Sequence, residues 1–124
     1  MTKTELLALA ERVEALTGPD RETDYRIAKW RSGAKGSHLK IEQVPPLYTA
    51  SLDAAMTLVP EGCLFHVRTF WDGMETRGYA RVITYADDAE ECDGKRYIDD
   101  YAEMAATPAQ ALTAAALYAH AAAY

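Results

Sequence analysis

The C-terminal segment PAQALTAAALYAHAAAY is built almost entirely from alanine and other small residues, which restricts what it can form. Alanine is the strongest helix former, and Thr107, Pro108 and Gln110 supply an N-cap, a first-turn proline and the third residue of a capping box. We therefore predict a helix that begins at Pro108. Small residues occupy nearly every side of this helix, so another helix can pack closely against it, either within the fold or across a dimer.

Two leucines, Leu112 and Leu117, are the only large aliphatic side chains of this segment. We expect both to be buried against a sheet or a neighbouring helix. The segment is a poor membrane span, because alanine enters lipid only weakly and polar residues interrupt the run. The N-terminal residues MTKTELLALAERVEAL are charged throughout, unlike the apolar core of a signal peptide. We expect no membrane segment and a cytoplasmic location.

Three further helices are predicted from caps and periodicity. Thr2 and Glu5 form a capping box before an apolar stripe at Leu6, Leu9, Val13 and Leu16. Gly18-Pro19 ends this helix, and a short second helix over 20–31 follows, with candidate contacts at Tyr25, Ile27, Ala28 and Trp30. Ser51 is the N-cap of a third helix, which has its stripe at Leu52, Ala55, Met56 and Val59 and stops at 60–62.

Strand-forming residues are concentrated in the second half of the chain. Residues 63–71 and 78–85 flank a turn and predict a β-hairpin. Residues 95–104 suit a third strand or a short helix, and a strand is favoured because an isolated hairpin is only marginally stable. We expect a single α+β domain over 1–124, in which a three-stranded antiparallel sheet packs with about four helices. A long loop at about 32–47 could hold a short strand at 38–43.

The overall charge limits the classes of partner. The formal net charge is −6, and hydrophobic and charged residues make up 49% and 26% of the chain. This composition is that of an ordinary folded protein. A negative chain is repelled by nucleic acid and by anionic lipid. We therefore expect neither nucleic acid nor membrane as a partner.

Three stretches of the chain resemble the phage ABA sandwich domain family. They are ELLALAERVEALTGPDRETD (5–24), YTASLDAAMTLVPEG (48–62) and ATPAQALTAAAL (106–117). The resemblance implies a sheet with helices packed against it in an α-β-α sandwich-like arrangement. It also implies a bacteriophage or prophage origin. The family has no agreed activity, so it contributes no catalytic residues and no cofactor.

A basic stretch is the best candidate for a small-ligand site. Its cationic and aromatic side chains belong to Lys29, Trp30, Arg31, Lys35, His38 and Lys40. Cations, an aromatic ring and glycine backbone donors form a set that binds phosphates and nucleotides. The spacing of the glycines does not match a phosphate-binding loop. The alternative is a solvated surface loop.

Aromatic residues on the predicted sheet are the second candidate site. Trp71, Tyr79, Tyr85 and Tyr97 could form a patch for a protein partner, since tyrosine and tryptophan are favoured interface anchors. The alternative is that they fill the core or form cross-strand pairs.

Chemical motifs are weak throughout. Cys63 and His66 point to opposite faces of a strand and cannot pair, so we expect no Cys/His catalysis. Both Cys63 and Cys92 lie outside any CxxC motif, and we expect reduced thiols that are not bonded to each other. The acidic run at 87–93 matches a calcium loop poorly, so we expect no metal site.

The sequence thus favours a non-enzymatic phage or prophage accessory protein that acts by binding, most readily to a host or phage protein. A second copy of the chain is another possible partner. The alternative is a protein that binds or sequesters a nucleotide or other small anionic ligand, with a counter-defence role. An enzyme is the least favoured class, because no two polar residues are forced onto a common catalytic face.

Overall fold

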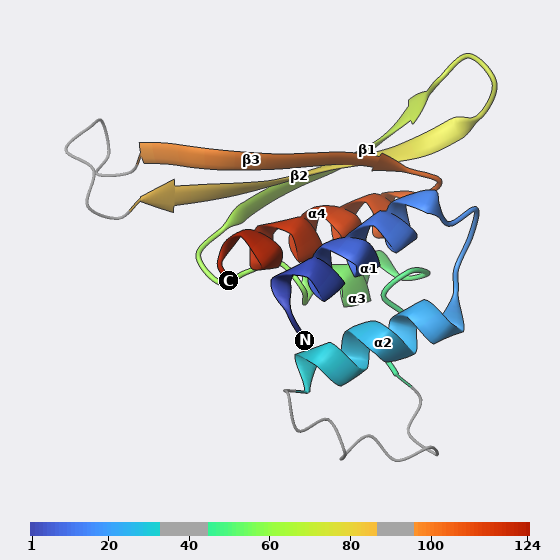
Figure 1. The fold of residues 1–124 in the computed structure, drawn as a ribbon. Coiled ribbons are helices and arrows are strands. Elements are labelled where there is room, and N and C mark those ends of the chain that lie inside the picture. Colours follow the sequence, from blue (N-terminus) through green and yellow to red (C-terminus); the bar gives the residue numbers. More distant parts are fainter. Residues whose placement is uncertain (33–44, 87–95) are drawn as a thin grey trace.

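The computed structural model describes residues 1–32, 45–86 and 96–124, without the side chains of 85, 86, 96–100 and 102. Two helices open the chain, a short third helix precedes a three-stranded sheet, and a long helix closes it (Figure 1). The elements are α1 (Lys3–Ala15), α2 (Arg21–Arg31), α3 (Leu52–Met56), β1 (Leu64–Trp71), β2 (Thr76–Ala86), β3 (Arg96–Ala105) and α4 (Pro108–Ala122).

The sheet is antiparallel with the order β1-β2-β3. Residues 96–105 form a strand, which decides between the two alternatives for that segment. The pairing of β1 with β2 runs in unbroken register from Leu64↔Ile83 to Trp71↔Thr76. The pairing of β2 with β3 shifts between Thr84 and Tyr85. The expected α+β class, with a three-stranded antiparallel sheet and four helices, is confirmed.

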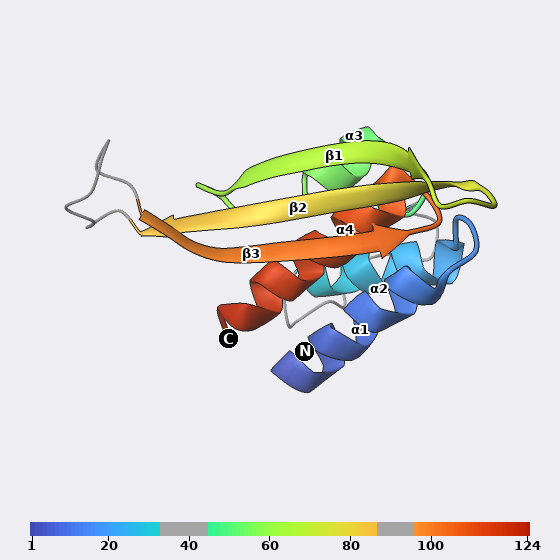
Figure 2. The same cartoon turned by 90° about the horizontal axis from the view of Figure 1, so that it is seen from above.

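The described helices all lie on one face of the sheet, as Figures 1 and 2 show. Helices α4 and α1 are nearest the strands, and α2 lies beyond α1. The layer order therefore differs from the helix–sheet–helix sandwich that the resemblance implied. The physical reason is visible in β2, because only one of its two faces carries the small apolar residues against which a helix can pack.

Gly78 explains how closely α4 approaches that face. A Cβ atom at this position would lie 2.1 Å from the carbonyl carbon of Thr107 and 2.2 Å from the nitrogen of Pro108. Any side chain larger than hydrogen would therefore collide with the backbone at the start of α4. The glycine lets the helix begin directly over β2.

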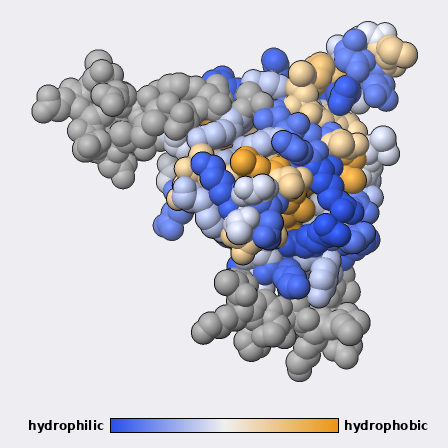
Figure 3. Space-filling view, viewed as in Figure 1, coloured by the Kyte–Doolittle hydropathy of each residue, from blue (hydrophilic) through white to orange (hydrophobic). Residues whose placement is uncertain are grey.

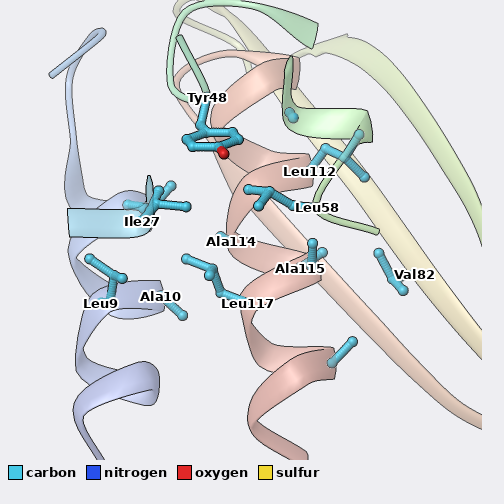
Figure 4. Packing of buried hydrophobic residues seen from close by; sticks show 14 of the residues in the cluster. Leu9, Ala10, Ile27, Tyr48, Leu58, Val82, Leu112, Ala114, Ala115 and Leu117 are labelled. Atoms are coloured by element: carbon cyan, nitrogen blue, oxygen red, sulfur yellow. The ribbon is translucent and has the colours of Figure 1, made fainter. Parts of the chain in front are cut away.

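The core is centred on α4, which is buried almost all round between α1 and the sheet (Figure 4). Leu112 and Leu117 are fully buried, as expected from the sequence. In Figure 4 Leu117 lies toward Leu9 and Ala10 of α1, and Val82 of β2 lies on the other side of α4. The small residues thus serve close packing within the fold.

Three polar residues of α4, of which Gln110 and Thr113 are buried and His120 is partly buried, each bind a main-chain carbonyl of a connecting segment. The bonds are Gln110 Nε2 to Leu16 O at 3.0 Å, Thr113 Oγ1 to Tyr48 O at 2.9 Å, and His120 Nε2 to Leu58 O at 2.7 Å. Buried carbonyl groups need hydrogen-bond partners, and these bonds supply them in the connecting segments. The bonds also attach those segments to α4.

The predicted caps are confirmed at Thr2, Ser51 and Thr107, each of which accepts a hydrogen bond from the residue three places on. The apolar stripe predicted for the third helix is confirmed at Ala55 but wrong at Leu52 and Met56. Helix α3 ends at Met56, both Leu52 and Met56 are exposed, and the buried residues there are Ala55 and Leu58. Tyr25 of α2 is exposed too, whereas Ile27 and Ala28 are buried. A short helix turns too few residues toward the core for periodicity to identify its buried side.

Candidate functional site

The side chains predicted for a small-ligand site have structural contacts where they are described. Trp30 Nε1 donates to the Tyr124 hydroxyl at 3.1 Å, and its ring meets the edge of His120 at a centroid distance of 4.9 Å. Arg31 donates to Thr57 O at 3.2 Å. Lys29 is exposed. Lys35, His38 and Lys40 lie outside the described residues. Trp30 and Arg31 therefore tie the end of α2 to α3 and α4.

The four aromatic candidates do not form one patch in the described part of the structure. Tyr79 is on the sheet face away from the helices, whereas strand alternation puts Trp71 on the other side, where it is 66% exposed. Tyr85 and Tyr97 are partners in the β2–β3 register, and their side chains lie outside the described ones.

The helix-free side of the sheet, hereafter the open face, is defined by the alternation of the strands. Ala80 and Val82 are buried beneath α4, so their neighbours on β2 point away from the helices. The cross-strand register places partners from β1 and β3 on the same side. Its described members are Leu64, His66, Arg68, Phe70, Arg77, Tyr79, Arg81, Ile83 and Met104.

Aromatic and cationic side chains lie side by side on the open face. The Arg68 guanidinium carbon sits 4.8 Å from the centroid of the Tyr79 ring, a cation–π contact. His66 meets the same ring edge-on at 6.5 Å. The planar guanidinium therefore rests on a ring that limits its motion, which preorganises it to bind a carboxylate or phosphate.

Arg77 lies at the hairpin end of the open face. Its Nη1 is 4.0 Å from Asp72 Oδ2, and its Nε is buried without a hydrogen-bond partner within the described ranges. The Asp72 carboxylate also caps the hairpin turn. Its Oδ1 accepts hydrogen bonds from the backbone nitrogens of Met74 and Glu75 at 2.8 Å each. Those backbone hydrogen bonds, together with the charge of Arg77, lower the pKa of Asp72.

The open face is thus a cationic area on a chain whose net charge is −6. Three arginines and a histidine belong to it, and none of its described side chains is acidic. Asp100 is the register partner of Ile83, and its side chain is not among the described ones. Apolar area accompanies the charge, since Leu64 is 56% and Met104 57% exposed. On the helical side, Figure 3 shows hydrophilic residues around a hydrophobic area at the centre of the view.

A second cluster of ionisable groups lies on the covered side of the sheet. Glu103 of β3 faces the helices, where it meets Glu14 of α1 and Tyr118 of α4. Burial and the adjacent Glu14 carboxylate raise the pKa of Glu103 to about 8. Burial and the same carboxylate also raise the pKa of the Tyr118 hydroxyl. Glu14 Oε1 is buried without a hydrogen-bond partner among the described residues. This cluster can hold one proton between two carboxyl groups.

Other buried ionisable groups have structural roles. The buried Asp24 carboxylate accepts from the Thr49 nitrogen at 2.8 Å and from its hydroxyl at 2.9 Å, and it pairs with Arg21 at 2.9 Å. Cys63 is a free, partly buried cysteine, and burial raises the pKa of its thiol, which disfavours the reactive thiolate. Cys92 and the acidic run at 87–93 lie outside the described residues.

Sequence reasoning missed the arginines of the open face. Arg68, Arg77 and Arg81 are spread over two strands, and only the register reveals that they share a side. A usable signal was present, because period-two alternation already separates Arg81 from its buried neighbours Ala80 and Val82. The Glu14–Glu103–Tyr118 cluster had no such signal, since its members come from three elements distant in sequence.

No described helix has the length and the apolar character needed to cross a membrane. Within the described ranges, His, Cys, Asp and Glu side chains form no group of three that could hold a metal ion. Comparison of the chain with protein-family models, with curated proteins and with solved structures finds no match.

Proposed function

We propose that this chain is a non-enzymatic binding protein that docks an acidic protein partner on its open face. The observation that carries the proposal is the composition of that face, where cations and aromatic rings gather on an otherwise acidic chain. The likeness of three sequence stretches to the phage ABA sandwich family supports a phage or prophage accessory role for it.

The physical argument begins with what a folded domain needs for stability. A face that serves only solubility needs no arginine held on a tyrosine ring and no exposed leucine or methionine beside it. Arginine and tyrosine are enriched among the residues that dominate binding energy at protein interfaces. The local positive charge would also steer an acidic partner toward this face and raise the association rate at low salt.

The alternative ligand is a nucleotide or other small anion. The guanidinium of Arg68 on the Tyr79 ring is a suitable element for phosphate or base binding as well. A protein partner is favoured because the described face is a strand surface with apolar residues spread across it. Small-molecule sites are usually concave and enclose most of the ligand.

Affinity capture from host lysate tests the proposal with two matched double variants. Arg68→Glu/Arg77→Glu reverses the charge of the open face, and Lys3→Glu/Arg26→Glu makes the same total charge change at exposed positions on α1 and α2. We expect the first variant to lose a partner that the wild type and the second variant retain. Retention of every partner by the first variant would contradict the proposal. Native mass spectrometry of the captured material would reveal a small anionic ligand instead.

A further inference from the structure

The edge of the sheet beside the open face gives the partner a specific mode of attachment. Strand β1 pairs with β2 alone among the described elements, so its other side is a sheet edge. It is eight residues long and in unbroken register with β2. Alternate N–H and C=O groups along such an edge point outward, where they can pair with another strand.

Natural proteins usually protect an edge of this kind with a proline, a lysine, a bulge or a covering element. LFHVRTFW contains neither proline nor lysine, and the only register shift in the sheet lies between β2 and β3. Exposed apolar side chains run along the strand, including Leu64, Phe65 and Trp71. The edge therefore has the properties of a template for strand addition.

The charge of β1 argues against a second copy as the occupant. If two copies of β1 paired antiparallel about a two-fold axis near the strand centre, same-face residues would lie opposite each other. In the register that places Arg68 opposite its own copy, two guanidinium groups would face each other. Like charges directly opposite each other destabilise a pair of strands. An acidic strand would instead meet Arg68 with the opposite charge.

We infer that the partner binds as an extended acidic segment that adds as a fourth strand along β1. This inference rests on the proposed function and specifies its chemistry. Because successive side chains of a strand alternate between faces, one set would lie on the open face beside His66 and Arg68. The other set would lie beside Phe65, Val67 and Trp71. The segment therefore alternates acidic and apolar residues.

Selection from a library of short random peptides tests the pattern. Binders are selected on the wild-type protein and counter-selected on Arg68→Glu, with Lys3→Glu as the control that all selected peptides should still bind. We expect the enriched sequences to alternate acidic with apolar residues. Enrichment of sequences without acidic residues, or without a period of two, would overturn the inference.

Backbone pairing is tested on the best selected peptide. Methylation of alternate amide nitrogens removes donors along one edge and leaves every side chain in place. We expect one of the two methylated sets to weaken binding about tenfold or more, as for the loss of a few hydrogen bonds. Amide hydrogen exchange of β1 should slow on binding of the unmodified peptide. Unchanged affinity of both methylated peptides, or unchanged exchange in β1, would rule out strand addition.

These outcomes separate the inference from the proposed function. If Arg68→Glu/Arg77→Glu loses the captured partner while methylated peptides bind normally, the open face binds a partner without strand addition. If the double variant retains that partner, the proposed function itself fails. A dimer of the purified wild type in native mass spectrometry, abolished by Arg68→Glu, would replace the acidic segment with a second copy and overturn the inference.

Discussion

The two faces of the sheet differ residue by residue along a single strand. On β2, Gly78, Ala80 and Val82 are buried beneath α4, whereas Tyr79 and Arg81 between them belong to the open face. The covered side is made of small residues that admit a helix at close range. The open side of β2 has long and charged side chains. The comparison teaches that strand alternation reserves one face of β2 for packing and leaves the other free for the proposed binding role.

The covered face is not uniformly apolar, however. It includes Glu103, whose pKa is raised to about 8 by burial and by Glu14. A protonated carboxyl is tolerated among helices because it is neutral, so this group makes the covered face sensitive to pH.

The largest effect is expected for a leucine of the core. Leu112→Ala should lower the free energy of unfolding by about 2–5 kcal/mol, because the fully buried side chain leaves a cavity in the packing around α4. Leu64→Ala on the open face is the matched control and should change it by less than about 0.5 kcal/mol. Urea denaturation measures both. Equal denaturation midpoints for the two variants would contradict the view that the covered face supplies stability and the open face does not.

The next effect concerns the close approach of α4 to β2. Gly78→Ala should destabilise the fold by about 1–3 kcal/mol, because the new methyl group meets the backbone at Thr107 and Pro108. Gly18→Ala is the control, since a Cβ there has no atom within 4 Å. Thermal unfolding compares the two. A stable Gly78→Ala variant would show that the helix start can move away from the strand.

A third prediction concerns pH. The folded-state pKa of Glu103 is raised from its ordinary 4.5 to about 8. Between these values the unfolded chain releases a proton that the folded chain retains, so the contribution of Glu103 to stability falls as pH rises through this window. Glu103→Gln removes that loss. The melting temperature of the variant should therefore rise relative to wild type as pH increases from 5 to 8.

The measured quantity is the difference in melting temperature between Glu103→Gln and wild type at each pH. A difference is needed because His120 changes the stability of both proteins with pH in the opposite direction. Burial lowers the pKa of His120, so its contribution to stability is lost as pH falls below the ordinary value of 6.5. Both proteins share that effect. Glu61→Gln, at an exposed position before β1, is the control and should give a flat difference. If the difference in melting temperature between Glu103→Gln and wild type does not change with pH, the folded protein does not retain the proton on Glu103.

The smallest effect on stability is expected on the open face. Arg68→Ala removes an exposed cation–π contact with Tyr79 and should lower the free energy of unfolding by less than about 1 kcal/mol. The same substitution should weaken partner binding, with the greatest loss at low salt, where charge attraction is least screened. A large loss of stability would show that Arg68 contributes mainly to folding and not to binding.

Much of the fold was predictable because its signals are local. A Ser or Thr hydroxyl caps a helix by accepting a hydrogen bond from the backbone nitrogen three residues later. This contact is local and does not depend on the tertiary structure, which is why Thr2, Ser51 and Thr107 were identified as caps. The burial of Leu112 and Leu117 followed from their being the only leucines on a helix of small residues. The helix stripe over 52–59 was right at Ala55 but failed at Leu52 and Met56, because α3 is short and Leu58, beyond its end, is buried in their place.

The sequence alone determined where the capped helices begin, which segments form strands, and which leucines of α4 are buried, since each depends on residues within a few positions of one another. Only the tertiary structure decided that the described helices share one face, that Arg68 rests on Tyr79, and that Glu103 meets Glu14. These facts depend on strand register and helix placement. The placement of α4 depends on the close approach of Thr107 and Pro108 to Gly78, residues far apart in the chain.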